Sequence, residues 1–512
     1  MSSPTRTSST APAASAARYG GWHKVTSPGI GPLGLAGTIA GISGLVAAFL
    51  VGSLVSPVAG LVLAVLTVAG LVPLVVHARD GRTGYGWAGA RLGFGWARAR
   101  GRSRYTPAML GGRVAMGWSG PCPTPGLLAR SQLRGVIVPL WDEVGVLRTR
   151  ANRWTVLLEC PIDSAALVDP DTLAGWTEAW GHWLASLPHE AHVHAATVTV
   201  ESYPDPGQAL IAETTRLHQM GAPTLAGAFL DEVATVWPGE SHSARVWVAI
   251  VFTTHRPGQR PATPGQMCDL VTERVAGLCA SLAKGTGVGR TAPMTPGQLV
   301  AIARTAYDPQ AAGLFDAAEA SGIDHGLTWA QAGPVAAEEA WDHYRHDGAV
   351  SVTYKMTSAP AGDVVAGVLA PLLDPTPGLA RKRVTLIYRH HDAAEAARIA
   401  DADLRTAASR AGERRGQVRA GHAAALDQAR TAADEQAAGA GLTRLSLLVT
   451  ATVTDPEGLP TARTLVEQLG ARSRLALRPC YGSQAAAFTA ALGLGVLPTD
   501  VTRIPDTLRD AL

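Results

Sequence analysis

The segment SLAKGTGVGR, residues 281–290, combines one lysine with three glycines at alternate positions. Such a composition suits a phosphate-binding loop, because glycine lets backbone N–H groups approach the oxygens and lysine adds positive charge. A P-loop, however, reads G-x-x-x-x-G-K-[ST] between a strand and a helix. Here Lys284 precedes the glycines, and no glycine precedes Lys24, Lys355 or Lys382, the other lysines. We therefore interpret the segment as a helix end followed by a loop, and we expect the purified chain not to hydrolyse ATP or GTP.

Histidines at 189, 192 and 194, in HEAHVH, are the nearest approach to a metal motif. The spacing is not that of H-E-x-x-H, and no third or fourth ligand follows at a recognisable distance. The five cysteines form no CxxC pair, which is typical of reduced thiols in a protein that faces the cytosol. We expect no metal, no cofactor and no catalytic residues, and thus a protein that is not an enzyme.

Three tryptophans, Trp176, Trp180 and Trp183, recur at helical spacing within 171–187. They share one face of the expected helix. Packing into the core is the simpler interpretation. The alternative interpretation is that part of this stripe is exposed and docks a partner, since tryptophan is enriched in the hot spots of protein interfaces.

Residues 25–76 contain no Asp, Glu, Lys, Arg or His. A membrane-spanning helix needs about 20 apolar residues, so this stretch fits two spans. We expect helices near 33–53 and 57–77, joined by a turn at GSLVSP, residues 52–57. Gly37, Gly41, Gly44 and Ala48 form a small-residue stripe that lets helices approach closely. Pairing within the hairpin is the first interpretation, and pairing with another subunit is the alternative.

The flanks of this stretch are basic. Residues 1–104 carry ten Arg or Lys and one acid, a charge of +9, whereas the remainder carries 34 basic and 40 acidic residues, a charge of −6. The positive-inside rule then places both ends of the hairpin, and so both termini, in the cytoplasm of a cell (inner) membrane. Arginines interleaved with aromatic residues are expected to contact the lipid surface: Arg79, Arg82, Arg91, Arg98, Arg100, Arg102 and Arg104. We expect no sequence-specific binding to nucleic acid.

The rest of the chain predicts an α+β fold, with mixed or antiparallel sheets and helices on one face. Strands are expected at 154–161, 192–203, 244–255, 349–356, 383–390, 443–455 and 474–480. Helices are expected at 171–187, after capping boxes at Thr263 and Thr295, and at 360–374, 457–470 and 483–492. An Ala/Arg-rich region, about 392–438, predicts one kinked helix or two long helices.

This pattern predicts seven segments. They are a disordered cytoplasmic tail (1–24), the membrane hairpin (25–78), a basic, Gly/Pro-rich connector (79–150), a first α+β unit (151–290), a helical connector (291–348), a second α+β unit with a long helical insertion (349–496) and a C-terminal tail (497–512).

From residue 383 onward the sequence resembles the amino-terminal, non-motor domain of the large ATPases of conjugation and type IV secretion. The resemblance rests on RVTLIYRH, AARIADADLRTAASR, LTRLSLLVTATVTD and RLALRPCYGSQAAAFTAALGLG. The motor is absent from this sequence, and the proline expected near 490–495 is missing. With its two-span start, the chain is similar to a family of actinobacterial integral membrane proteins associated with mobile elements, through AGPVAAEEAWDHYRHDGAVSVTY, RKRVTLIYRH and YGSQAAAF.

The resemblance implies a membrane-anchored scaffold subunit that docks a separate translocation ATPase and other membrane subunits, as an oligomer within the complex. We expect residues 483–512 to lie at or beside the ATPase contact. Two alternatives stay open. The chain also resembles the EccE subunit of type VII secretion, which combines two N-terminal spans with a cytoplasmic α+β domain, and a membrane-bound enzyme of unknown reaction is the third.

Overall fold

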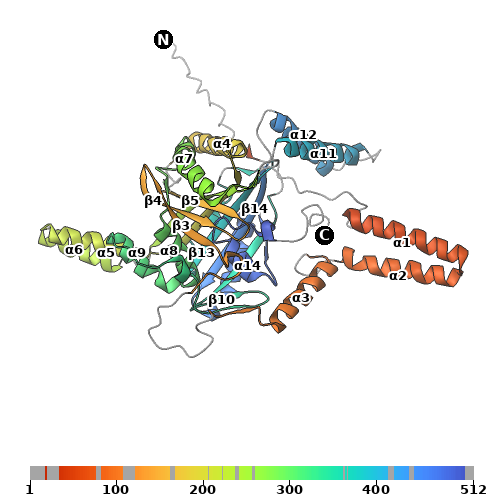
Figure 1. Ribbon diagram of the computed structural model, residues 1–512, viewed down its shortest axis with the longest axis horizontal. Helices are drawn as coiled ribbons and strands as arrows, with labels where there is room; N and C mark the ends of the chain where they lie inside the picture. Colours follow the sequence, from red (N-terminus) through yellow and green to blue (C-terminus); the bar gives the residue numbers. More distant parts are fainter. Residues whose placement is uncertain are drawn as a thin grey trace, which may run out of the picture.

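The computed structural model shows a hairpin of two apolar helices on one side of a large α+β body (Figure 1). It describes residues 18–19, 34–76, 82–107, 122–161, 168–205, 207–221, 223–236, 241–255, 260–360, 364–365, 367–391, 393–412, 420–437 and 443–501. The tail expected at 1–24 lies outside these ranges except for the short strand β1 (Arg18–Tyr19), which pairs with β12 (Val364–Val365).

The expected hairpin is confirmed as α1 (Gly34–Leu54) and α2 (Pro57–Val75). Both are long and apolar enough to cross a membrane, by length and composition. Ser56 and Pro57 begin the second helix, because the Ser56 hydroxyl accepts a hydrogen bond from the Ala59 N–H and proline is tolerated in the first turn. The two helices extend away from the body side by side (Figure 1).

One antiparallel sheet forms the body, in the order β2-β9-β10-β11-β14-β13-β6-β7-β5-β4-β3. Its strands are β2 (Arg104–Tyr105), β3 (Gln132–Val138), β4 (Trp141–Arg148), β5 (Arg153–Cys160), β6 (Val193–Pro204), β7 (His242–Thr253), β9 (Ala337–Glu339), β10 (Tyr344–His346), β11 (Ala349–Ser358), β13 (Arg381–His390) and β14 (Thr443–Val453). Two short strands join beside this path: β8 (Ala292–Pro293) pairs with β5, and β15 (Ala476–Pro479) pairs with β11.

Helices cover both faces of this sheet, because side chains of a strand alternate between its two faces. Val156 and Leu158 of β5 pack with α4 (Pro170–Ser186) and α7 (Pro264–Ala283), whereas Leu157 between them packs with α8 (Pro296–Tyr307). On the face of α8 lies α14 (Gln484–Ala490). On the opposite face, α10 (Ala370–Leu373) and α13 (Leu459–Arg472) pack on β11, β13 and β14. Both capping boxes, at Thr263 and Thr295, are confirmed.

Two helix pairs project from the body. One is α5 (Gln208–Gln219) with α6 (Thr224–Val236), which lies beside α9 (Ala312–Ala320) at the end opposite the hairpin (Figure 1). The other is α11 (Ala393–Gly412) with α12 (Ala420–Ala437). The Ala/Arg-rich region is therefore two helices, one of the two forms that the sequence left open.

The strands expected in two α+β units belong to one sheet, because β6 of the first unit pairs along its length with β13 of the second. The basic connector also holds regular structure that the sequence analysis did not predict: α3 (Gly84–Ala99) and the hairpin of β3 and β4. The helix predicted at 360–374 is wrong. Val364–Val365 form the strand β12, Gly367 has a φ of +83°, which ends a helix, and among the described residues of this range only the four of α10 are helical.

Candidate membrane-proximal site

The inner seam of the hairpin is built from the small residues that the sequence singled out. A side chain on Gly44 would meet Thr67 Cγ2 at 2.4 Å, and one on Gly60 would meet Gly52 Cα at 2.4 Å. Gly37, Gly41 and Ala48 are buried on the same side of α1. The glycines are thus needed for the close approach of α1 and α2, and this pairing lies within one chain.

The outer surface of the hairpin is apolar and open. Phe49 is 75% exposed, and leucines and valines are exposed along both helices. In water such a surface is unfavourable, at about 25 cal/mol for each Å² of apolar area. Lipid tails remove this cost, so the arrangement suits two helices that face hydrocarbon on the outside and each other on the inside.

Helix α3 connects the hairpin to the body. Thr83 caps its first turn by accepting from the Gly86 N–H, and the Tyr85 hydroxyl donates to the Gly70 carbonyl of α2 at 2.8 Å. Gly84 lies against Pro73, where an added Cβ would meet the Pro73 oxygen at 2.9 Å. The start of α3 is therefore fixed to the end of α2.

The other side of α3 packs on the body through Trp341, which the sequence analysis did not select. The Arg91 guanidinium lies 4.2 Å from the Trp341 ring centroid, and the Phe94 ring meets the same indole edge to face at 5.5 Å. Trp341 stacks on Tyr481, whose carbonyl accepts from Arg82 at 2.9 Å. Cation–π contacts of this kind contribute about 0.5–2 kcal/mol each. No single feature of the sequence marks Trp341, because its partners come from segments far along the chain.

The seven predicted lipid-contact arginines divide into groups. Arg82 and Arg91 contact the body, Arg104 pairs with Glu338 at 3.2 Å, and Arg79 lies outside the described residues. The remaining three are exposed around the end of α3, together with Trp96, over which the Arg100 guanidinium lies at 3.7 Å: Arg98, Arg100 and Arg102. This basic end of α3 is the surface that can meet anionic headgroups.

The tryptophan stripe of α4 faces inward. Trp183 is buried, Trp180 stacks on it at 4.9 Å and meets the Tyr388 ring at 6.1 Å, and Trp176 covers Gly287. Core packing therefore accounts for the stripe.

The glycine-rich segment, residues 281–290, packs against the tryptophan stripe of α4. Lys284 is the C-cap residue of α7, and Gly285 and Gly287 have φ values of +76° and +71°. A Cβ on Gly287 would lie 2.3 Å from the Trp176 ring. These glycines permit a helix end and a tight fit beneath α4.

The three histidines do not converge. His189 is exposed, His192 Nδ1 lies 2.8 Å from the Thr253 carbonyl, and His194 Nε2 lies 3.9 Å from Asp500. Among the described residues, no group of three or more His, Cys, Asp or Glu side chains is placed to hold a metal ion.

The C-terminal segment is part of the core as far as it is described. Residues 487–497 are buried against α8 and the centre of the sheet, with Phe488 among Tyr307, Tyr344 and His346. The expected ATPase contact at or beside residues 483–512 stays a prediction: residues 487–497 are covered, residues 498–500 are half-buried, and residues 502–512 lie outside the described part of the chain.

A family model described as a domain of unknown function (DUF8461) matches residues 26–86. The match spans α1, α2 and the start of α3. No curated protein matches the chain.

Proposed function

We propose that this chain is a membrane-anchored, non-catalytic scaffold subunit of a conjugation or type IV-like secretion machine. Both termini lie in the cytoplasm, and the body docks a separate translocation ATPase at the inner face of the membrane. The proposal needs an anchor that holds the body in a defined place.

The contact of α3 with Trp341 is the observation that carries this proposal. Arg91 and Phe94 fix α3 on the body, while Tyr85 fixes the start of the same helix on α2. A loose tether would need none of these contacts. This packing joins the hairpin to the large antiparallel sheet, whose main path contains eleven strands. Such a sheet suits a rigid support for a partner.

The type of machine is supported by sequence resemblance, which covers β13, α11–α14 and the strands between them. The Trp176 stripe and α14 are covered, whereas other surfaces of the body are open to a partner. The open helix pair of α5 and α6 is one such surface, with Leu225 and Phe229 exposed.

Affinity purification of the tagged full-length chain from its native membranes, followed by mass spectrometry, tests this function. We expect recovery of a translocation ATPase and further membrane subunits. Trp341→Ala should reduce that recovery while the chain stays in the membrane, and Trp96→Ala, which changes an exposed tryptophan of α3, should not. Recovery of type VII components instead would favour the EccE-like alternative, and recovery of no ATPase would contradict the proposal.

A further inference from the structure

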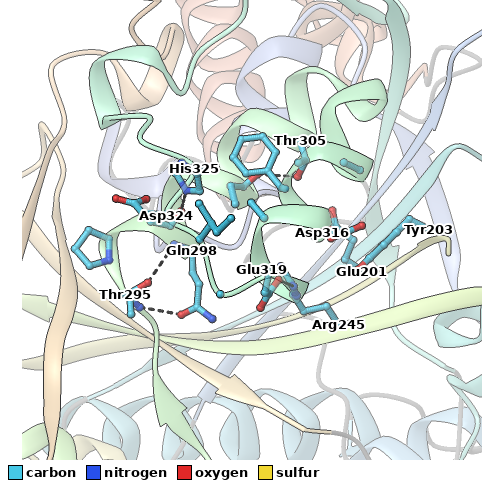
Figure 2. A pocket seen from close by; sticks show the side chains of 18 of the residues that line it. Glu201, Tyr203, Arg245, Thr295, Gln298, Thr305, Asp316, Glu319, Asp324 and His325 are labelled. Carbon is cyan, nitrogen blue, oxygen red and sulfur yellow. Dashed lines mark hydrogen bonds and ion pairs between the residues drawn. The ribbon is translucent and has the colours of Figure 1, made fainter. Parts of the chain in front are cut away.

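A cavity of about 530 Å³ lies on the α8 face of the sheet, beside α8 and α9 (Figure 2). Its floor is formed by ends of β6, β7 and β13, and its walls are formed by α8, α9 and the segment after α9. This volume falls within the range of about 300–1,000 Å³ that small-molecule sites occupy. Phe315, Ala301, Ala312 and Ala318 give the walls an apolar part.

Acidic groups outnumber basic ones in the lining. Two arginines, Arg245 and Arg381, face five carboxylates: Glu143, Glu201, Asp316, Glu319 and Asp324. The lining charge is 2 − 5 = −3, and Arg383, which binds Glu201 from behind, brings it to −2.

Both lining arginines already have carboxylate partners. Arg381, with 5% of its side chain exposed, donates to Glu201 at 2.7 Å, and Arg245 donates to Glu319 at 3.0 Å. His325 is held by backbone groups: its Nε2 lies 3.0 Å from the Gly297 carbonyl, and its Nδ1 accepts from the Leu327 N–H. The positive charges of the cavity are therefore used within the protein.

Asp316 is a half-buried acid of this lining that forms no ion pair among the described residues. It lines the cavity near Glu201 and Tyr203 (Figure 2), and its Oδ2 is buried with no hydrogen-bond partner among the described residues. Burial raises the pKa of this carboxyl, against the opposing effect of Arg245 and Arg381. A carboxylate in this position gains from a cation that enters the cavity, because a charge-assisted pair is stronger away from bulk water.

We propose that this cavity binds an organic cation, an ammonium or guanidinium group on a short apolar stem, with Asp316 as the anionic partner of the charge. Phe315 and the alanines of α8 and α9 pack on the stem. The cation is either a free small molecule or a Lys or Arg side chain of a partner segment, since both present the same chemistry. This inference does not depend on the function proposed above.

The test is calorimetric titration of the full-length protein in a non-ionic detergent. The probes are n-butylguanidinium and its neutral isostere n-butylurea, with acetyl-Ala-Arg-Ala-amide and its citrulline counterpart as the peptide pair. We expect the guanidinium probes to bind and the neutral probes not to bind. Tighter binding of the arginine peptide would assign a side chain of a partner, and tighter binding of n-butylguanidinium would assign a free cation.

Asp316→Asn keeps the shape of the side chain and removes its charge, so affinity should fall by roughly ten- to a hundredfold. Asp269→Asn removes an exposed acid of α7 outside the cavity and should leave affinity unchanged. Ala312→Leu fills the cavity without changing its charge and should also weaken binding of the cation. This variant tests the proposal if the Asp316 variant does not fold. Equal affinity in wild type and both cavity variants, or no binding of either cation, would overturn the proposal.

Discussion

Phe488 is fully buried in a cluster with three rings from two other elements, α8 and β10. Its ring lies 5.3 Å from Tyr307, 5.3 Å from Tyr344 and 4.8 Å from His346. Phe488→Ala leaves a cavity among groups that cannot close it, and we expect a loss of about 3–5 kcal/mol in the free energy of unfolding. Chemical denaturation of the full-length chain in detergent measures this loss. Phe229→Ala, at a phenylalanine that is 65% exposed on α6, should change stability by less than about 0.5 kcal/mol.

Glu201 supports a prediction about pH. Burial opposes its ionisation, but the guanidiniums of Arg381 and Arg383 outweigh burial and lower its pKa to about 2. The unfolded value is about 4.3, so the stabilisation is complete above that pH and is lost as the pH falls toward 2. Glu201→Gln leaves two buried cations without their anion and should cost about 3–5 kcal/mol at pH 7.

Denaturation of wild type and Glu201→Gln at pH 7, 5 and 3.5 checks this prediction. The difference in the free energy of unfolding should be similar at pH 7 and 5, and smaller at 3.5. A difference that stays constant to pH 3.5, or that grows on acidification, would show that Glu201 is not an ionised partner of these arginines.

Single residues were predictable where their role depends on neighbours in the chain. Lys284 was correctly placed at a helix end because the helical pattern before it and the glycines after it are local. Trp341 and Glu201 were missed, since their partners are more than a hundred residues away and a lone tryptophan or glutamate looks alike in many settings. Asp316 was missed because its role depends on a cavity formed by several elements, which no local pattern reveals.

At the scale of elements, the seam between α1 and α2 predicts a difference between two glycines of one helix. Gly60→Ala places a methyl group 2.4 Å from Gly52 Cα, so the helices must separate, whereas Gly70 has only the Tyr85 hydroxyl at 4.0 Å. We expect Gly60→Ala to lower the SDS concentration at which the hairpin unfolds in mixed micelles, and Gly70→Ala to leave it almost unchanged. Equal midpoints for the two variants would contradict a backbone-tight seam.

Elements were predictable where a periodic pattern is bounded by caps. The apolar run at 25–76, the Thr-Pro starts at 263 and 295 and the alternating strands all give local constraints. The segment at 360–374 failed because Gly367 and a nearby proline override its apolar spacing. Helix α3 was read as a basic surface only, since its many glycines weaken the helical pattern.

The topology is a prediction for the whole molecule. Basic residues on both sides of the hairpin should keep both ends inside, with only the turn near Leu54 outside. A membrane-impermeant maleimide applied to intact cells should label Leu54→Cys and not Arg98→Cys, while both should react after lysis. Labelling of Arg98→Cys in intact cells would contradict the hairpin topology.

The arrangement of the sheet could not be predicted from the sequence. The alternation of each strand sets which residues face the core, but it does not set which strand lies beside which. β6 and β13 are neighbours although their paired residues Lys382 and Ser202 are far apart in the chain. Two separate α+β units and one continuous sheet have the same local sequence patterns. Only the pairing of β6 with β13 distinguishes them.

The order of the strands also determines when each strand can find its partner during synthesis. β2 leaves the ribosome at residue 105 but pairs with β9 at residues 337–339, and β14, near the middle of the sheet, is finished at residue 453. At about 5–20 residues per second, the 348 residues between 105 and 453 take roughly 17–70 seconds to synthesise. During that interval the hairpin can already enter the bilayer while apolar strands await partners, and such unpaired edges aggregate readily. Production of this protein should therefore depend on chaperones at the membrane, and slower translation, which lengthens this interval, should lower its yield.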